Sequence, residues 1–129
     1  MGEKIRVMIC KAGAKAKLAE IENSMESMEK TVGGLTDPVF LDTNNILLIC
    51  NEEALIRRLP KNIAFGYTDK QGLLERKEHK GMITSIIHGD CFFCSYDSEQ
   101  QPCSLSDEQI ELLKNSIYIY KESKDEERK

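Results

Sequence analysis

A histidine and two cysteines lie within seven positions of one another in the stretch HGDCFFCSYD, residues 88–97. Histidine and cysteine are common zinc ligands, and a C-x-x-C pair at a helix start is a common redox arrangement. A structural zinc site takes four ligands, and this sequence has one such cysteine pair. The surrounding β-branched and aromatic residues predict a strand. Cys91 and Cys94 then point to opposite faces of a sheet, so we predict neither a metal site nor a redox site.

The other residues with acid–base chemistry form no catalytic pattern. The sequence contains two histidines, His79 and His88, but neither a G-x-S-x-G nor an H-E-x-x-H motif. Glu52 and Glu53 are adjacent carboxylates, but neighbours on a strand point apart. The glycine pair 33–34 ends a predicted helix, whereas a phosphate site needs glycines before a helix start. We therefore expect no catalytic residue, no cofactor and no enzymatic activity.

The segment NEEALIRRLPKNIAFGY, residues 51–67, carries the groups that a small nucleotide pocket needs. The guanidinium group of arginine binds phosphate or carboxylate groups, the amide of asparagine forms hydrogen bonds with the polar edge of a ligand, and aromatic rings stack on bases. A basic surface loop that closes the sheet would contain the same residue types, and that alternative stays open. The candidate ligand-binding residues of this segment are Asn51, Arg57, Arg58, Lys61, Asn62, Phe65 and Tyr67.

Several predicted strands must position these residues. Alternating apolar residues over 4–10 predict a strand, and residues 17–22 predict its hairpin partner beyond a turn. Apolar runs over 37–43 and 45–51 predict a second hairpin. The long β-branched and aromatic stretch 82–97 contains at least one further strand. These elements indicate a mostly antiparallel sheet.

A first helix is predicted over 24–32. At its start, the side chain of Asn23 or Ser24 can accept a hydrogen bond from an unpaired backbone N–H. At its end, Gly33-Gly34 provides a glycine C-cap. Thioether and branched side chains at helical spacing normally fill a core. We expect the buried face of this helix to contain Met25, Met28 and Val32.

A second helix is predicted over 107–120. Ser106 and Gln109 have the S-x-x-Q spacing of a capping box, and Asp107 and Glu108 are favoured by the helix dipole. The expected buried stripe is Ile110, Leu113, Ile117 and Tyr120.

These elements predict one α+β domain over residues 1–121, with two helices and a mostly antiparallel sheet. A chain of 129 residues has the length of one domain with one ordinary core. Residues 122–129 contain no apolar residue, and we expect a charged, disordered tail there.

The composition excludes several protein classes. No apolar run approaches the ~18 residues that cross a bilayer, and the first residues lack a signal-peptide pattern. Five cysteines, an odd number, do not suit a secreted disulfide framework. A net charge of −4 makes general nucleic-acid binding unfavourable, because phosphate affinity comes mainly from lysine and arginine. We expect a cytoplasmic protein with no membrane contact.

Four motifs, in this order and spacing, resemble a known family. They are AEIENSMESMEKTVGG, LLICNEEALIRRLPKN, IIHGDCFF and SLSDEQIE. They resemble the domain of unknown function 3846 family, small proteins of bacteria, plasmids and phages, over residues 4–117. Ile63 stands where the family pattern has arginine. His88 stands where it has alanine, so we add His88 to the ligand-binding candidates as a residue at the pocket edge.

The resemblance implies a mobile-element origin, a compact α+β fold and a bacterial host, but no activity. Small phage proteins that block host defences often act by binding. The leading hypothesis is a non-enzymatic phage or mobile-element protein that sequesters a small nucleotide immune signal, with a site in residues 51–80 near a homo-oligomer interface. One alternative is an inhibitor that binds a host defence protein through an acidic surface. Another is a housekeeping binding module of a mobile element.

Overall fold

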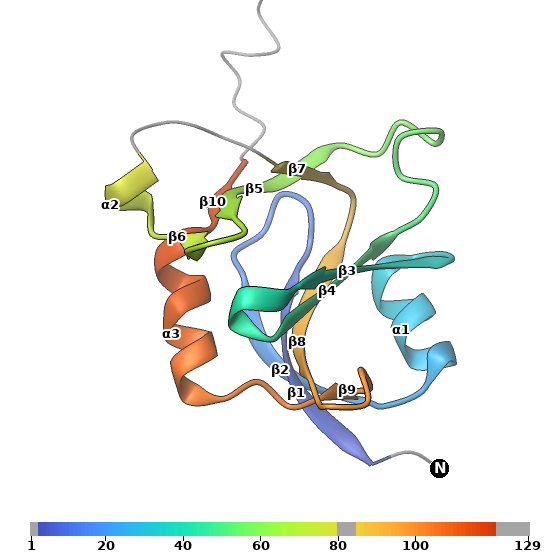
Figure 1. The fold of residues 1–129 in the computed structure, drawn as a ribbon. Coiled ribbons are helices and arrows are strands. Elements are labelled where there is room, and N and C mark those ends of the chain that lie inside the picture. The colour runs from blue at the N-terminus through green and yellow to red at the C-terminus, as the bar shows by residue number, and fades with distance from the viewer. Residues whose placement is uncertain (1–2, 80–84, 121–129) are drawn as a thin grey trace, which may run out of the picture.

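Six antiparallel strands form the main sheet, which runs through the middle of the molecule (Figure 1). The computed structural model describes residues 3–79 and 85–120. The strands are β1 (Lys4–Cys10), β2 (Lys17–Glu22), β3 (Thr36–Leu41), β4 (Ile46–Asn51), β8 (Cys91–Tyr96) and β9 (Pro102–Cys103). Their order is β2-β1-β8-β4-β3, and β9 pairs with β8 beside this path. Both predicted hairpins, β1–β2 and β3–β4, are confirmed.

A second, four-stranded sheet lies across one end of the first. Its strands are β5 (Lys61–Thr68), β6 (Gly72–Leu74), β7 (Ser85–His88) and β10 (Tyr118–Ile119). Their order is β10-β5-β6, with β7 also paired to β5. The predicted strand region at 82–97 therefore contains two strands in different sheets. The two strands are separated by a sharp turn at Gly89. Its φ of +76° would strain any other residue, and an added side chain would lie too close to Leu59.

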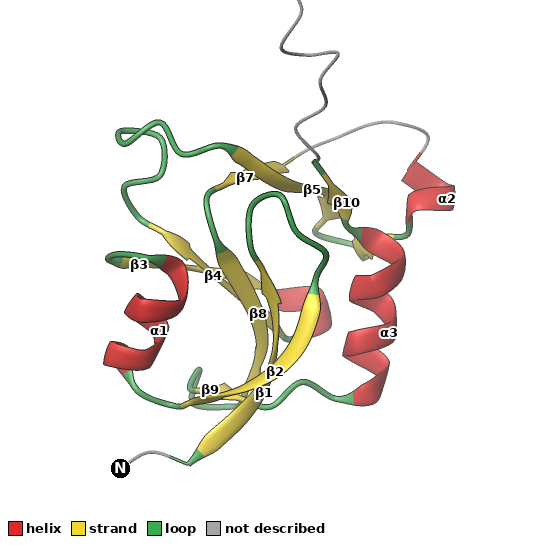
Figure 2. Cartoon of the chain, turned by 180° about the vertical axis from the view of Figure 1, so that it is seen from behind, coloured by secondary structure: helices red, strands yellow, loops and turns green. Residues whose placement is uncertain are grey.

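Helices cover both faces of the main sheet, as Figure 2 shows from behind. The helices are α1 (Met25–Val32), the 3-10 turn η1 (Asp42–Asn44), α2 (Arg76–His79) and α3 (Asp107–Ser116). At the centre of the sheet both faces are covered, so β4 is buried along its whole length and does not alternate between buried and exposed residues, whereas the edge strands β2 and β3 are partly exposed. None of the helices in the described part of the chain has the length and apolar composition needed to cross a bilayer.

The two faces of the sheet contribute to two separate apolar cores. Cys91 and Phe93 pack in the core that contains residues of α3, whereas Phe92 and Cys94 pack in the core that contains residues of α1. Alternation along β8 produces this division, because successive strand residues point to opposite faces. The prediction that Cys91 and Cys94 lie on opposite faces is confirmed.

Helix α3 is shorter than predicted. Its capping box is confirmed, because Gln109 N donates to Ser106 Oγ at 3.1 Å and Ser106 N donates to Gln109 Oε1 at 2.9 Å. The helix ends at Ser116, and the following residues form β10 instead of continuing to residue 120. Extended Ile117 turns the chain toward β5, where strand pairing satisfies backbone groups that a longer helix would leave at an open sheet edge. Tyr120 is thus outside the helix.

Helix α1 is confirmed with one correction to its buried face. Ser24 is its N-cap, accepting from Ser27 N at 3.1 Å. Met28 and Val32 are buried, but Met25 is 60% exposed. Helical side chains tilt toward the N-terminus, so the side chain of this first helical residue extends past the packed turn into solvent.

One element was missed by the sequence analysis, and one prediction lies outside the described residues. Helix α2 was not predicted, because its four residues are polar and too few to show a periodic pattern. The tail predicted over 122–129 lies outside the described residues.

Candidate ligand-binding site

The eight candidate residues from the sequence are dispersed over the structure. Asn51, Asn62 and Phe65 are buried, and the others are exposed or half-buried at several positions. Two pairs come together: Lys61 is the register partner of His88, and Asn51 lies with Arg57 beside Gly34. None of the eight lines either of the two cavities described below.

The buried candidates have their polar groups committed to the fold. Asn51 Nδ2 donates to Val32 O at 3.1 Å, and its Oδ1 accepts from Glu53 N at 2.8 Å. Asn62 is fully buried, and its Nδ2 donates to Cys10 O at 2.6 Å and Gly89 O at 2.8 Å. These amides therefore tie separate segments together and do not face solvent.

The aromatic candidates are also in contact with other parts of the fold. Phe65 packs edge-on against Phe93 in the core, with ring centroids 6.3 Å apart. The hydroxyl of half-buried Tyr67 accepts from Thr43 N at 3.2 Å. Both rings are therefore engaged in contacts within the fold.

The charged candidates lie on the surface. Arg57 Nη1 donates to Gly33 O at 3.1 Å, and Arg58 is exposed with a left-handed φ of 55°. The amine of Lys61 lies 5.7 Å from the ring centroid of Tyr120. The ring nitrogen Nδ1 of His88 is 3.2 Å from Leu59 O.

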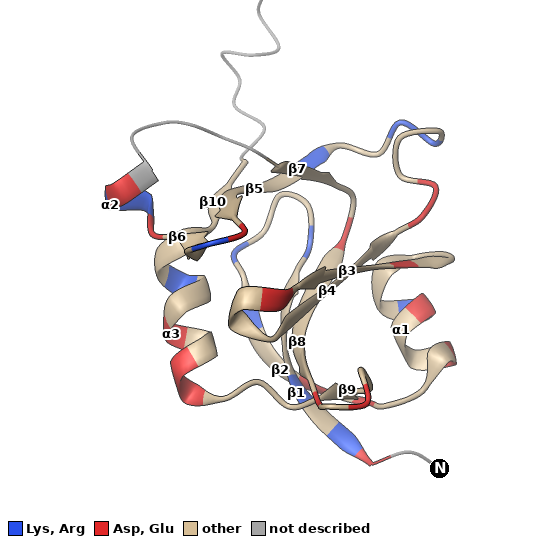
Figure 3. Ribbon diagram, viewed as in Figure 1, with Lys and Arg blue, Asp and Glu red and all other residues tan. Residues whose placement is uncertain are grey.

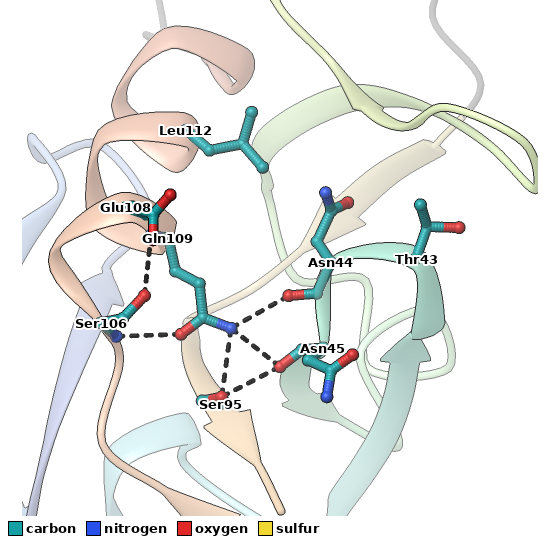
Figure 4. Close-up of a pocket in the computed structure, with 8 residues that line it drawn as sticks. All are labelled: Thr43, Asn44, Asn45, Ser95, Ser106, Glu108, Gln109 and Leu112. Carbon is teal, nitrogen blue, oxygen red and sulfur yellow. Dashed lines mark hydrogen bonds between the residues drawn. The ribbon is translucent and has the colours of Figure 1, made fainter.

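The first cavity, of about 550 Å³, is polar and wide open to solvent. Figure 4 shows Gln109 reaching from α3 toward Asn44, Asn45 and Ser95. Its amide nitrogen donates to Asn44 O and Asn45 O at 3.0 Å and to Ser95 Oγ at 3.1 Å. Its amide oxygen accepts from Ser106 N at 2.9 Å. The polar groups of Gln109 thus join α3 to the main sheet, and we assign this region to fold stability. Its described lining is Thr43, Asn44, Asn45, Ser95, Ser106, Glu108, Gln109 and Leu112.

The second cavity, of about 450 Å³, combines an apolar wall with positive charge. This volume lies in the range of small-molecule sites. It lies between the β1–β2 turn, the end of α3, β10 and the start of α2. Its described lining is Met8, Lys15, Ala16, Arg76, Lys114, Ile117, Tyr118 and Ile119. We call these eight residues the basic cleft.

Three cations from three separate segments reach the basic cleft. Lys15 comes from the turn after β1, Lys114 from the last turn of α3, and Arg76 from α2. Arg76 is held in place, because its Nη1 donates to Lys114 O at 2.7 Å and Ile117 O at 2.8 Å. The described lining contains no carboxylate, so these charges are not neutralised within the wall.

The apolar wall of the basic cleft is rigid where the core supports it. Met8 is 2% exposed and Ile117 is 5% exposed, and both belong to the core that α3 covers. Tyr118 lies beside them, and its hydroxyl donates to Arg76 O at 3.5 Å. Such a wall accepts a flat or apolar group, while the cations accept an anionic group.

The basic cleft was not predicted from the sequence. Lys15, Arg76 and Lys114 are about 40 to 60 residues apart in the chain, so no local spacing connects them. The sequence signals are two basic blocks. Residues 1–19 contain five lysines and arginines against one acid, and residues 54–80, which include Arg76, contain seven against three.

Three buried thiols, those of Cys50, Cys91 and Cys94, are poor nucleophiles and poor metal ligands in this environment. Burial, with a smaller contribution from Asp37, raises the pKa of Cys50 to about 12. Burial likewise raises the pKa of Cys94 to about 12. The pKa of Cys91 is raised by its hydrogen bond with Cys10 and then by burial. Thiolate is the reactive and metal-binding form, so these groups are inert near neutral pH. Across residues 3–79 and 85–120, no three histidine, cysteine or acidic side chains converge on a point that would hold a metal.

Comparison with known proteins gives a family but no activity. A family model with the description "Domain of unknown function (DUF3846)" matches residues 5–118. The searches of curated proteins and of solved structures found no match.

Proposed function

Because the chain belongs to the DUF3846 family, a domain of unknown function, we propose a function from geometry: non-enzymatic binding of a small anionic ligand in the basic cleft. The observation that carries this proposal is the convergence of Lys15, Arg76 and Lys114 on an apolar wall that contains no carboxylate among its described residues. The described wall also contains no imidazole or thiol. What supports binding is the positive charge beside an apolar wall, the two features that a small anionic ligand with an apolar part requires.

A nucleotide is the ligand class that fits both the cations and the apolar wall of the cleft. Its phosphates would pair with the three cations, and its base would lie against Tyr118 and the side chains of Ile117 and Ile119. We propose that this nucleotide is an immune signal of a bacterial host and that the protein sequesters it on behalf of a phage or other mobile element. This site shares only Arg76 with the segment 51–80 that the sequence suggested, because its other residues come from the β1–β2 hairpin, the end of α3 and β10.

Thermal unfolding with a ligand panel tests the proposal. Nucleoside monophosphates, cyclic dinucleotides and cyclic ADP-ribose isomers would be added separately. A ligand that binds only the folded state raises the melting temperature, by on the order of 10 °C at a concentration about 100-fold above its Kd. Chromatography of the heated sample should recover the ligand intact. Recovery of a chemically altered ligand would show an enzyme instead.

Charge reversal in the cleft should abolish this shift. In Lys15→Glu/Lys114→Glu two of the three cations are reversed, and both side chains are exposed, so the fold should tolerate the change. We expect affinity to fall at least tenfold. The matched control is Lys30→Glu/Lys70→Glu, which makes the same charge change away from the cleft. No shift with any ligand, or an equal loss in the control, would refute the proposal and favour inhibition of a host protein through an acidic surface.

A further inference from the structure

The loop between β4 and β5 presents the two most exposed large apolar side chains in the described part of the chain. Leu55 is 72% exposed and Ile56 is 84% exposed. Single exposed apolar residues are ordinary, but adjacent ones that project from the body favour an interface. Figure 1 shows this loop extending from one corner of the molecule, away from α3.

The loop is ordered by its own hydrogen bonds. Arg57 N donates to Glu53 O at 2.9 Å, and Leu59 N donates to Ala54 O at 2.9 Å. Ala54 is buried and Leu59 packs against Gly89, so both ends of the turn are anchored. The outward position of Leu55 and Ile56 is therefore a consequence of a defined turn.

A third apolar residue lies next to this loop. Leu35 is 51% exposed, and its carbonyl accepts from Glu52 N at 2.8 Å. Arg57 Nη1 also reaches Gly33 O at 3.1 Å, which joins the loop to the corner between α1 and β3. We call Leu35 with residues 52–58 the corner patch.

Opposite charges flank the apolar centre of the corner patch. Glu52 and Glu53 precede Leu55-Ile56, and Arg57 and Arg58 follow it, as Figure 3 shows along the loop. All four charged residues are exposed. Within the described residues, none of the four has an ion-pair partner. The patch therefore presents acidic, apolar and basic groups in this chain order around one turn, with both charge types exposed to a partner.

We propose that the occupant of the corner patch is a second copy of this chain, related by a two-fold axis. A two-fold axis places the same patch on both subunits in opposite directions. The acidic pair of one copy then faces the basic pair of the other, twice, while Leu55 and Ile56 pack at the centre. The four charges of the patch sum to zero, so two patches meet without net repulsion although each chain carries −4.

Other occupants match the charge order less well. An acidic partner would oppose Glu52 and Glu53, and a basic partner would oppose Arg57 and Arg58. Like charges across an interface suppress association, so a copy of the same loop is the complementary surface. Only three apolar side chains lie at the centre, which predicts a small interface and a concentration-dependent dimer.

Sedimentation equilibrium tests this dimer directly. We expect wild-type protein to change from monomer to dimer between about 1 µM and about 1 mM, the range for small interfaces. Leu55→Asp/Ile56→Asp should raise the dissociation constant at least tenfold. Both side chains are exposed, so circular dichroism and the melting temperature should show an intact fold.

Charge reversal identifies the surface and its symmetry. Arg57→Glu/Arg58→Glu makes both flanks acidic, and Glu52→Arg/Glu53→Arg makes both basic. Each variant alone should remain monomeric, whereas an equimolar mixture should form a heterodimer. Controls that reverse two charges elsewhere, Lys30→Glu/Lys70→Glu and Glu20→Arg/Glu99→Arg, should dimerise like wild type.

Two results would overturn the proposal. One is a wild-type protein that is monomeric up to about 1 mM, since even a weak small interface associates by then. The other is a dimer that persists unchanged in both reversed variants, because a second copy would then use a different face.

Discussion

Asn62 is a polar residue whose role depends entirely on its surroundings. Its side chain is fully buried, and one amide group holds the ends of two strands through Cys10 O and Gly89 O. Its Oδ1 has no hydrogen-bond partner in the described structure. The same asparagine on an exposed loop would suit a polar ligand, and its neighbours in the sequence favour that interpretation.

Replacing Asn62 with alanine should therefore destabilise the protein. Asn62→Ala removes the buried hydrogen bonds to Cys10 O and Gly89 O, and loss of a buried hydrogen-bond partner costs about 1–3 kcal/mol, partly offset by removal of the unpartnered oxygen. We expect the free energy of unfolding to fall by about 2 kcal/mol in urea titration. Asn115→Ala, on the accessible part of α3, is the control and should change it by less than about 0.5 kcal/mol. Equal effects in the two variants would contradict a buried structural role.

At the scale of elements, α3 illustrates both local and tertiary control. Its start is local, because Ser106 and Gln109 cap each other over three residues. Gln109 also bonds to Asn44, Asn45 and Ser95, so the cap fastens the helix to the main sheet. Its end is tertiary, because pairing of Tyr118 and Ile119 with β5 terminates the helix.

Removal of this cap should lower the free energy of unfolding more than removal of an isolated helix cap does. Ser106→Ala loses the bond to Gln109 N, and such substitutions typically cost about 1 kcal/mol. Gln109→Ala loses the other half of the cap and the bonds to the sheet, so we expect a larger loss of about 2 kcal/mol. A double-mutant cycle by urea unfolding should show coupling between the two residues, with Ser98→Ala as a surface control. Strictly additive effects would argue against a shared cap.

At the scale of the whole molecule, two cores lie on the two sides of one sheet. Cys50 belongs to the core that α3 covers, and Cys94 belongs to the core that α1 covers. Both thiols are kept neutral by burial. Unfolding exposes both thiols to water. The stability of the protein at alkaline pH therefore depends on the thiols of both cores.

Stability should decrease from about pH 9 toward pH 12. The pKa of each thiol is about 12 in the folded state against 9.0 when unperturbed, so between these values the unfolded chain loses protons that the folded chain retains. The stabilisation is complete below pH 9 and lost as pH rises through this window. Urea unfolding at a series of pH values measures it, and Cys50→Ala/Cys94→Ala should show a shallower decrease. An unchanged slope in that variant would show that other groups dominate.

Local patterns in the chain predicted both hairpins of the main sheet, α1 and the start of α3, because the causes of those elements are local. They did not predict β5, β6, α2 or β10. Alternation identified β1 and β2, and capping residues identified α1 and the start of α3. Strand alternation also placed Cys91 and Cys94 on opposite faces, so the sequence itself argues against a C-x-x-C site. The family assignment likewise came from four short motifs and was confirmed over residues 5–118.

Only the tertiary structure decides which residues suited to ligand binding come together. Asn62 and Phe65 look suited to a pocket in the sequence, but β5 is covered on both sides and buries them. Lys15, Arg76 and Lys114 look unrelated in the sequence, yet strand pairing and the end of α3 bring them to one cleft. Secondary structure follows from neighbours within a few positions, whereas a site depends on contacts across the whole chain. The sequence therefore determined the locally encoded elements and the placement of Cys91 and Cys94 on opposite faces, and only the packing of the elements determined the end of α3 and the basic cleft.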